Sequence, residues 1–207
     1  MPFSQEQFFE VFVKYNSFVF PFQILLFIAG SFCLSLILLK SKSAAKTVSY
    51  FLVLLWLWNG IVYHLYFFSE INKAAIAFGV LFILQAAFFL IEFVVKKQLF
   101  FSYENKFDMI TGYFLVIFGL VIYPAIGLLL GNDINRTILL GLPCPTVIYT
   151  FGIIVLSRKN YTLYKLIIPV IWAFIGFSAA IKFGVYQDVM LPVSAVISLV
   201  LFYRERI

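Results

Sequence analysis

Charged residues are scarce in this sequence. Only 12% of its 207 residues are Asp, Glu, Lys or Arg, and 64% are hydrophobic, whereas an average soluble domain carries about 25% charged residues. A soluble fold of this composition would expose a largely apolar surface, so we exclude an ordinary soluble domain. The net charge of +6 comes from basic residues scattered between apolar runs. Because they form no continuous patch, we expect no nucleic-acid partner.

Histidine and cysteine, the usual ligands of transition metals, are nearly absent. The chain has one histidine and two cysteines, so it cannot build a multi-histidine metal or haem site alone. Cys144 and His64 are candidates for a soft metal ion, but one thiol and one imidazole do not make a site. We therefore predict no cofactor. Cys33 and Cys144 fall in different hydrophobic runs, and we expect no disulfide between them.

What the sequence does have is long hydrophobic runs. There are seven, none interrupted by a run of charge, and each is close to the length of about 20 residues that crosses a bilayer as a helix. We predict an all-α fold, a polytopic membrane bundle of seven transmembrane helices that forms one integral membrane domain over residues 1–207. The spans are expected near residues 19–39, 47–68, 74–95, 109–130, 137–156, 163–181 and 186–203.

The segment before the first run is different. Residues 4–15 place Phe8, Phe9 and Phe12 on one helical face and most of their polar residues elsewhere. Ser4 and Gln7 have the spacing of a capping box, which starts a helix. This pattern predicts a short amphipathic helix that lies in the membrane interface.

The basic residues are distributed unevenly over the loops. Seven spans place the two ends of the chain on opposite sides of the membrane, with eleven basic residues on one side and four on the other. Since cytoplasmic loops carry the excess of Lys and Arg, we expect the N-terminus outside and the C-terminus in the cytoplasm. The eleven are Lys40, Lys42, Lys46, Lys96, Lys97, Lys106, Arg158, Lys159, Lys165, Arg204 and Arg206, and the four are Lys14, Lys73, Arg136 and Lys182.

Several polar residues lie inside the hydrophobic runs, where each unpaired polar group costs several kcal/mol. In the predicted topology they gather in the outer half of the bilayer, which suggests a polar cavity open to the outside. For Asn59, Tyr63 and His64 a plainer interpretation remains: Asn59 bridges helices, and the two rings sit in the interfacial belt. A sharper one makes His64 a proton carrier or soft ligand. The residues assigned to the cavity are Asn59, Tyr63, His64, Tyr123, Cys144, Thr146 and Ser178.

The segment from Gly141 to Thr146, GLPCPT, contains two prolines one residue apart. Pro143 and Pro145 remove two backbone donors and disfavour helix before them, so the fifth span should be kinked or locally unwound there. Three interpretations follow: a structural kink, a broken helix that contacts substrate, and a metal site that uses Cys144.

Charged residues within the runs have simpler explanations. Glu92 precedes Lys96 by four residues, so we expect the two to pair and to reach the cytoplasmic interface. Gln85 shares a helical face with Glu92, and a proton path between them is the less favoured alternative. Asp188 lies near the start of the last run and is expected to be interfacial.

Three stretches carry a resemblance to a known family: WNGIVYHLYFFSEINKAAIAFG, YPAIG and GLPCPTVIYTFG. They resemble the small bacterial membrane proteins of the domain-of-unknown-function 6064 family. The matching residues here are Gly60, Tyr63, His64, Ile71, Asn72, Ala74, Ala75, Tyr123, Pro124 and Pro143 to Thr146. The resemblance implies a bacterial origin and a location in the bacterial cytoplasmic (inner) membrane. It implies no mechanism, because the family has no assigned activity.

These observations lead to three functional hypotheses. The first is a membrane protein that binds or transports a small solute or ion through the outward-facing cavity. The alternative is a non-catalytic structural or assembly subunit, and a third is an enzyme or sensor that acts on a lipid or quinone. An enzyme is disfavoured because no catalytic pair or hydrolase motif is visible. The expected partners are membrane lipids and an unknown small molecule, and the sequence leaves open a homo-oligomer or a second membrane subunit.

Overall fold

The computed structural model describes residues 2–101, 105–157 and 164–204. The regular elements of these residues are all helices, which confirms the all-α prediction. The α-helices are α1 (Gln5–Val19), α2 (Phe22–Leu38), α3 (Ala44–Trp58), α4 (Ala75–Phe89), α5 (Lys106–Ile117), α6 (Tyr123–Leu129), α7 (Pro143–Leu156), α8 (Tyr164–Phe183) and α9 (Met190–Arg204).

Short helices of other types continue or connect the α-helices. Three of them are π-helical, and such segments change the direction in which side chains point and often occur at functional sites. The π-helical segments are η1 (Asn59–Phe67), η3 (Leu90–Val95) and η4 (Phe118–Ile122), and the 3₁₀ turns are η2 (Phe68–Glu70) and η5 (Tyr186–Val189).

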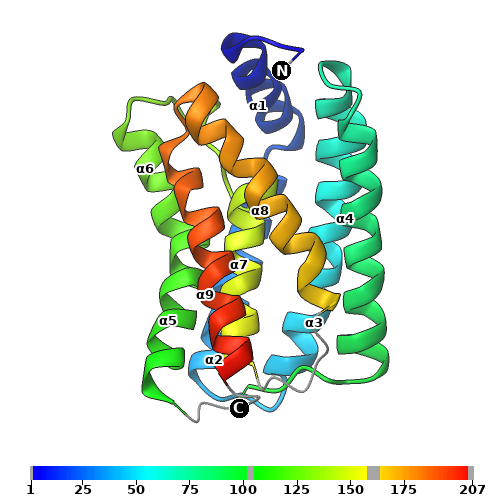
Figure 1. The fold of residues 1–207 in the computed structure, drawn as a ribbon, viewed down its shortest axis with the longest axis vertical. Coiled ribbons are helices and arrows are strands. Elements are labelled where there is room, and N and C mark those ends of the chain that lie inside the picture. The colour runs from blue at the N-terminus through cyan, green and yellow to red at the C-terminus, as the bar shows by residue number, and fades with distance from the viewer. Residues whose placement is uncertain (1, 102–104, 158–163, 205–207) are drawn as a thin grey trace.

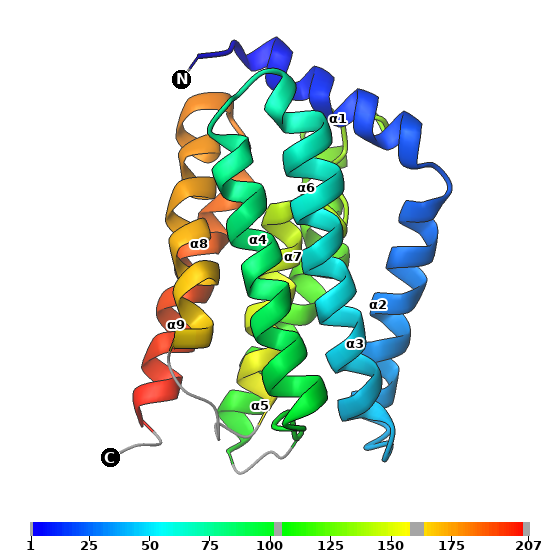
Figure 2. The ribbon, with the colours of Figure 1, turned by 90° about the vertical axis from the view of Figure 1, so that its right-hand side faces the viewer.

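Most of the helices run along one common direction, whereas α8 crosses them diagonally (Figure 1) and α1 lies across one end of the bundle (Figure 2). The last turn of α9 lies at the opposite end, as Figure 1 shows. We call the two ends the α1 end and the far end. The far end also holds the turn between α2 and α3, with Lys40 and Lys42.

The number of possible membrane spans is five or six, so the prediction of seven is wrong. Five helical stretches in the described part of the chain are long and apolar enough to cross a membrane: Ala44–Glu70, Ala75–Val95, Lys106–Leu129, Lys165–Phe183 and Tyr186–Arg204. A sixth arises only if α1 and α2, which meet at a bend of 86°, are counted as one span.

The shortfall comes from the runs predicted at 19–39 and 137–156. The first yields α2 with 17 residues. The second yields α7 with only 14 residues, about 21 Å of helix, against a hydrocarbon layer of about 30 Å. Gly141, with a φ of 105°, and the extended Leu142 keep the chain out of helix until Pro143.

A short α7 is tolerated because protein surrounds it. Every residue from Pro145 to Leu156 is buried, and α7 runs through the middle of the bundle between α5, α8 and α9 (Figure 1). Its closest neighbour is α5, where Gly112 and Gly152 face each other. A Cβ added to Gly152 would lie 2.6 Å from the backbone nitrogen of Val116, so the absence of a side chain is what lets these two helices approach.

The predicted N-terminal helix is present and longer than expected, since α1 extends to Val19. Its capping box is confirmed: the Gln7 amide donates to Ser4 Oγ (3.2 Å) and the Ser4 amide donates to Gln7 Oε1 (2.9 Å). The apolar face packs on the end of the bundle, where Phe8, Phe9 and Phe12 are buried.

Hydrogen bonds attach α1 to the segment before α7. Trp58 Nε1 donates to the Tyr15 hydroxyl (2.7 Å), which donates to the Gly141 carbonyl (2.9 Å). Asn16 Nδ2 donates to the carbonyls of Asn135 (2.6 Å) and Thr137 (2.9 Å). These bonds hold α1 in place as a cover over this end of the bundle.

Candidate functional site

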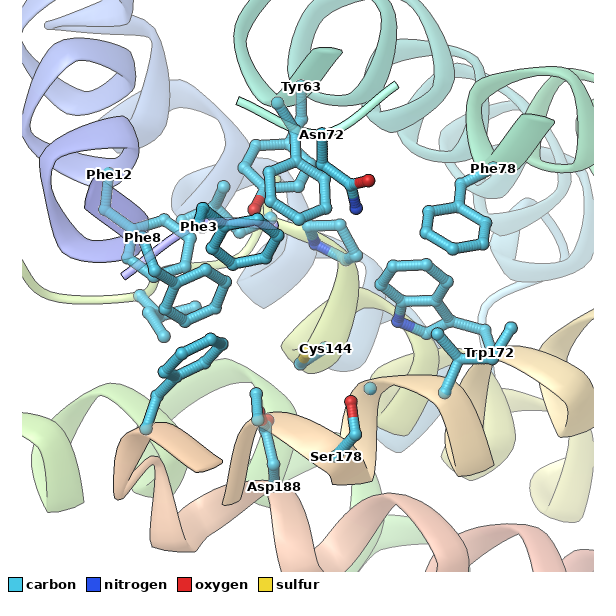
Figure 3. Close-up of a pocket in the computed structure, with 18 residues that line it drawn as sticks. Phe3, Phe8, Phe12, Tyr63, Asn72, Phe78, Cys144, Trp172, Ser178 and Asp188 are labelled. Atoms are coloured by element: carbon cyan, nitrogen blue, oxygen red, sulfur yellow. The ribbon is translucent and has the colours of Figure 1, made fainter. Parts of the chain in front are cut away.

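A cavity of about 230 Å³ lies beneath α1 (Figure 3). Its walls come from segments far apart in the sequence, which α1, η1, η2, α7, α8 and η5 bring together. The residues that line it are Phe3, Phe8, Phe12, Tyr63, Phe68, Asn72, Phe78, Ile138, Leu142, Pro143, Cys144, Trp172, Ile175, Gly176, Ser178, Ala179, Phe183 and Asp188.

Aromatic rings form most of the cavity wall. Phe8 stacks on Phe183 with 4.6 Å between ring centroids, and Phe3 packs against Phe183 at 5.6 Å. On the other side Trp172 meets Phe78 edge to face at 5.4 Å. Phe8 and Phe12 reach the cavity together because residues four apart share a helical face. The amphipathic pattern of α1 therefore supplies a cavity wall.

Asp188 is the ionisable acid of this cavity. It lies in η5, two residues before α9 begins, and only 1% of its surface is exposed. The Tyr123 hydroxyl donates a hydrogen bond to its Oδ1, and the Cys144 thiol interacts with both residues. Neighbouring helices therefore cover Asp188, and the expectation that it is interfacial stays a prediction.

No cation balances this acid among the residues that the structure describes. The described lining contains no Lys, Arg or His. The ion pairs found in the described ranges do not involve Asp188 either. The cavity thus combines aromatic walls with one carboxyl group that lacks a basic partner there.

The structure brings some of the predicted cavity residues together and separates others. Tyr63, Cys144 and Ser178 line the cavity, together with Pro143. Tyr123 adjoins it through its bond to Asp188. Four other residues of the predicted site do not line this cavity: Asn59, His64, Pro145 and Thr146.

Asn59 and Thr146 belong to a buried layer that joins two helices. Asn59 Nδ2 donates to the Leu55 carbonyl (2.8 Å) and to Thr146 Oγ1 (3.2 Å). One turn further along, Trp56 Nε1 donates to Thr150 Oγ1 (2.9 Å). These contacts connect α3 and η1 to α7, which is the bridging role described by the plainer interpretation of Asn59.

His64 lies behind the cavity wall in a box of aromatic rings. Its ring centroid is 4.7 Å from that of Phe82, 4.8 Å from Trp172 and 5.0 Å from Tyr63. The side chain is fully buried, and neither ring nitrogen has a hydrogen-bond partner in the described part of the chain. A buried imidazole without a partner is costly and requires an explanation.

The two prolines begin a helix and do not kink one. Pro143 is the first residue of α7, where its missing N–H costs nothing because that group has no partner inside a helix. The unwound part of the predicted span precedes it, and its Gly141 carbonyl accepts the bond from Tyr15. Cys144 follows Pro143 and thus reaches the cavity from the first turn of α7.

Comparison with known proteins gives a family and no activity. The sequence profile of a family of unknown function, DUF6064, matches residues 5–207. The chain belongs to this family. No curated protein and no solved structure matches the chain significantly. The resemblance seen in the sequence is therefore confirmed over nearly the whole chain, and the DUF6064 family leaves the function to be argued from the cavity.

A second group of buried charges in this DUF6064 chain lies toward the far end. Glu92 pairs with Lys96 (2.8 Å), as the spacing predicts, and also with Lys165 (2.6 Å). Lys165 Nζ further donates to Gln98 Oε1 (3.0 Å), and Gln85 Nε2 donates to the Lys165 carbonyl (3.0 Å). Gln85 and Glu92 are thus linked through Lys165, which is only 1% exposed.

Sequence reasoning missed Asp188 and Lys165. Lys165 was counted with the basic residues of the cytoplasmic side, at the start of the span predicted at 163–181, and was not expected to be buried. Asp188 did carry a signal: residues 184–192 contain no basic residue within one turn of it. An acid at the start of an apolar run without such a neighbour needs a partner from elsewhere in the fold.

Proposed function

We propose that this protein crosses a membrane and binds a small, largely apolar molecule in the cavity beneath α1. The observation that carries the proposal is the cavity itself, with about 230 Å³ of space, aromatic walls and a few polar groups. Ligand sites typically combine apolar walls with a small number of placed polar groups. An apolar cavity of about 150 Å³ holds benzene, so this one suits a molecule with one or two rings or a short branched chain.

The distribution of charge supports an orientation for the proposed site. Eight of the eleven basic residues of the larger group lie in the described part of the chain, in segments near the far end. Cytoplasmic segments carry the excess of Lys and Arg. We infer that the α1 end faces the outside and that the ligand enters from there. The membrane that we propose is the bacterial cytoplasmic membrane, which the family resemblance implies.

The arrangement below the cavity favours binding over an open passage. Asn59 lies one turn from Tyr63 toward the far end, and Trp56 and Phe82 pack there at 4.5 Å between ring centroids. These side chains are 0–1% exposed. Transport of the bound molecule would require this packed layer to open, so binding is the function that the observed conformation supports.

The alternative of a structural or assembly subunit is favoured by one observation. Asn59, His64 and Thr146 are completely buried, as expected of residues that only hold helices together. A subunit of this kind should also show an exposed interface of small residues, which permit close helix approach in membranes. The exposed positions instead include many large apolar side chains, such as Phe32, Leu54 and Phe174, which suit contact with lipid.

Thermal unfolding of the purified protein in detergent, with indole as the probe, tests the proposal. A ligand that binds only the folded state stabilises it by about 2.7 kcal/mol at 100 times its Kd, so indole should raise Tm until the effect saturates. Ser178→Phe fills the cavity and should abolish the rise. Ile181→Phe is the matched control, because it places the same ring on the same helix at a position that is 72% exposed.

The outcomes separate clearly. A saturable rise in the wild type and in Ile181→Phe, but not in Ser178→Phe, supports binding in the cavity. The proposal is wrong if the wild type shows no saturable rise, or if Ser178→Phe responds as strongly as the control.

A further inference from the structure

We propose that the molecule bound in the cavity is a small organic cation, a quaternary ammonium or alkylamine, held between the Asp188 carboxylate and the surrounding aromatic rings. This inference rests on the proposed function and adds the chemical class of the ligand. Three independent features of the cavity support it: its charge, the position of its carboxylate and the kind of side chain in its walls.

The first feature is the missing counter-charge. A carboxylate removed from water is costly unless a positive charge and hydrogen bonds compensate it. Asp188 is 1% exposed, lines the cavity, and has no basic partner in the described part of the chain. A cationic ligand would supply that charge, and the empty space next to the carboxylate is where it would sit.

The second feature is that two neighbours of Asp188 stabilise its charged form, whereas burial of the carboxyl group opposes that form. The Tyr123 hydroxyl donates to it, and a hydrogen bond to a charged acceptor is about twice as strong as one between neutral groups. Asp188 also lies two residues before Met190, the first residue of α9. The N-terminus of a helix carries a partial positive charge that stabilises a nearby carboxylate.

The third feature is the aromatic wall opposite and beside the carboxylate. Figure 3 shows Asp188 and Ser178 on one side of the cavity and Tyr63 on the opposite side. Phe78 and Trp172 form the wall that connects these two sides. The faces of Trp, Tyr and Phe attract cations, most strongly for Trp and when the cation is out of water. An apolar wall built of Leu and Ile would bind a neutral ligand equally well, so the use of rings favours a cation.

The test compares two water-soluble probes of the same shape. Choline carries a quaternary nitrogen where 3,3-dimethylbutan-1-ol carries a carbon, so only the charge differs. We expect the wild-type protein, titrated in detergent by isothermal calorimetry, to bind choline at least about tenfold more tightly than the alcohol. Asp188→Asn should remove that preference and leave the affinity for the alcohol within about twofold, which also shows that the variant is folded.

A second variant tests the aromatic contribution separately. Trp172→Leu keeps the wall apolar but removes its best cation-binding face, so choline should lose about threefold more affinity than the alcohol does. Equal binding of both probes by the wild type, or a charge preference that survives Asp188→Asn, would overturn the proposal of a cation. If indole still binds in those cases, the proposed function stands; if no probe binds, both proposals fail.

Discussion

Two buried acids in this protein have opposite surroundings. Glu92, toward the far end, lies between Lys165 (2.6 Å) and Lys96 (2.8 Å). Asp188, at the α1 end, has a phenol and a thiol beside it and a cavity in front of it. A buried acid with cations at contact distance is part of the protein's own structure. A buried acid without them, next to empty space, indicates that the missing charge comes from outside.

The largest change in stability is expected from removing Lys165, the buried cation that pairs with Glu92. Lys165→Met replaces the buried one of the two lysines that contact Glu92 and leaves the half-exposed Lys96 in place. Removing one partner of a buried ion pair costs about 3–5 kcal/mol, and Lys96 should keep the loss near the lower value. The free energy of unfolding, measured by titrating the purified protein in mixed micelles with SDS, should fall by that amount.

A double variant supplies the control for this prediction. Lys165→Met combined with Glu92→Leu removes both charges, and such replacements are often close to neutral. The double variant should therefore be more stable than Lys165→Met alone. If it is less stable, Glu92 contributes through contacts other than this pair, and the contrast with Asp188 weakens.

The uncompensated acid should matter less for stability. Asp188→Asn keeps an oxygen that accepts the Tyr123 hydroxyl, and it strands no opposite charge in the described part of the chain. We expect the free energy of unfolding to change by less than about 1 kcal/mol in the same SDS titration, because the weaker hydrogen bond of the amide is offset by the lower cost of burying a neutral group. A loss as large as that of Lys165→Met would mean that Asp188 has a structural partner and would remove the basis of the comparison.

The two acids also show which contacts can be predicted from the sequence of such a protein. The capping box of α1 and the pair of Glu92 with Lys96 were predictable because both depend on residues three or four apart. Lys165 lies 73 positions from Glu92 and Asp188 lies 65 from Tyr123, so their pairing depends on how the helices pack. The residue types were visible in the sequence, but their partners were not.

The prediction of seven spans was wrong for a related reason. An apolar run predicts burial, but it does not distinguish lipid from protein as the environment. The run at 137–156 forms a short helix enclosed by other helices, so it needs no length to match a bilayer. A cavity adjoins Tyr63 and Cys144, and the assignment of a functional site there stays a prediction. Part of its aromatic wall comes from α1, which was expected to face the membrane interface.

A gain in stability is expected at His64, which lies between the cavity and the packed layer. His64→Phe removes two ring nitrogens that have no partner in the described residues and keeps a ring in the aromatic box. Replacing an unpaired buried polar group should raise the free energy of unfolding by about 1 kcal/mol. His64→Ala is the matched variant, and it should lower stability because it leaves a hole among Phe82 and Trp172.

A different result at His64 would change the assignment of the site. If His64→Phe destabilises the protein, or weakens choline binding by more than His64→Ala does, the ring nitrogens contact a water or the ligand in solution. The polar part of the site would then extend behind Trp172, as the sharper interpretation of His64 requires.

The smallest change in stability is expected from removing the exposed ion pair that joins α1 to η2. Lys14 and Glu70 are 3.4 Å apart, with 60% and 50% of their side chains exposed, and surface pairs of this kind contribute about 0–1 kcal/mol. Lys14→Ala should change the free energy of unfolding by less than about 0.5 kcal/mol, and added salt should make that difference smaller still because it screens exposed charges. The cover formed by α1 depends on the buried bonds of Tyr15 and Asn16, so the choline affinity should also stay within about twofold. A larger loss of affinity without a loss of stability would show that this surface pair controls how α1 closes the cavity, and that the cavity depends on charges beyond Asp188.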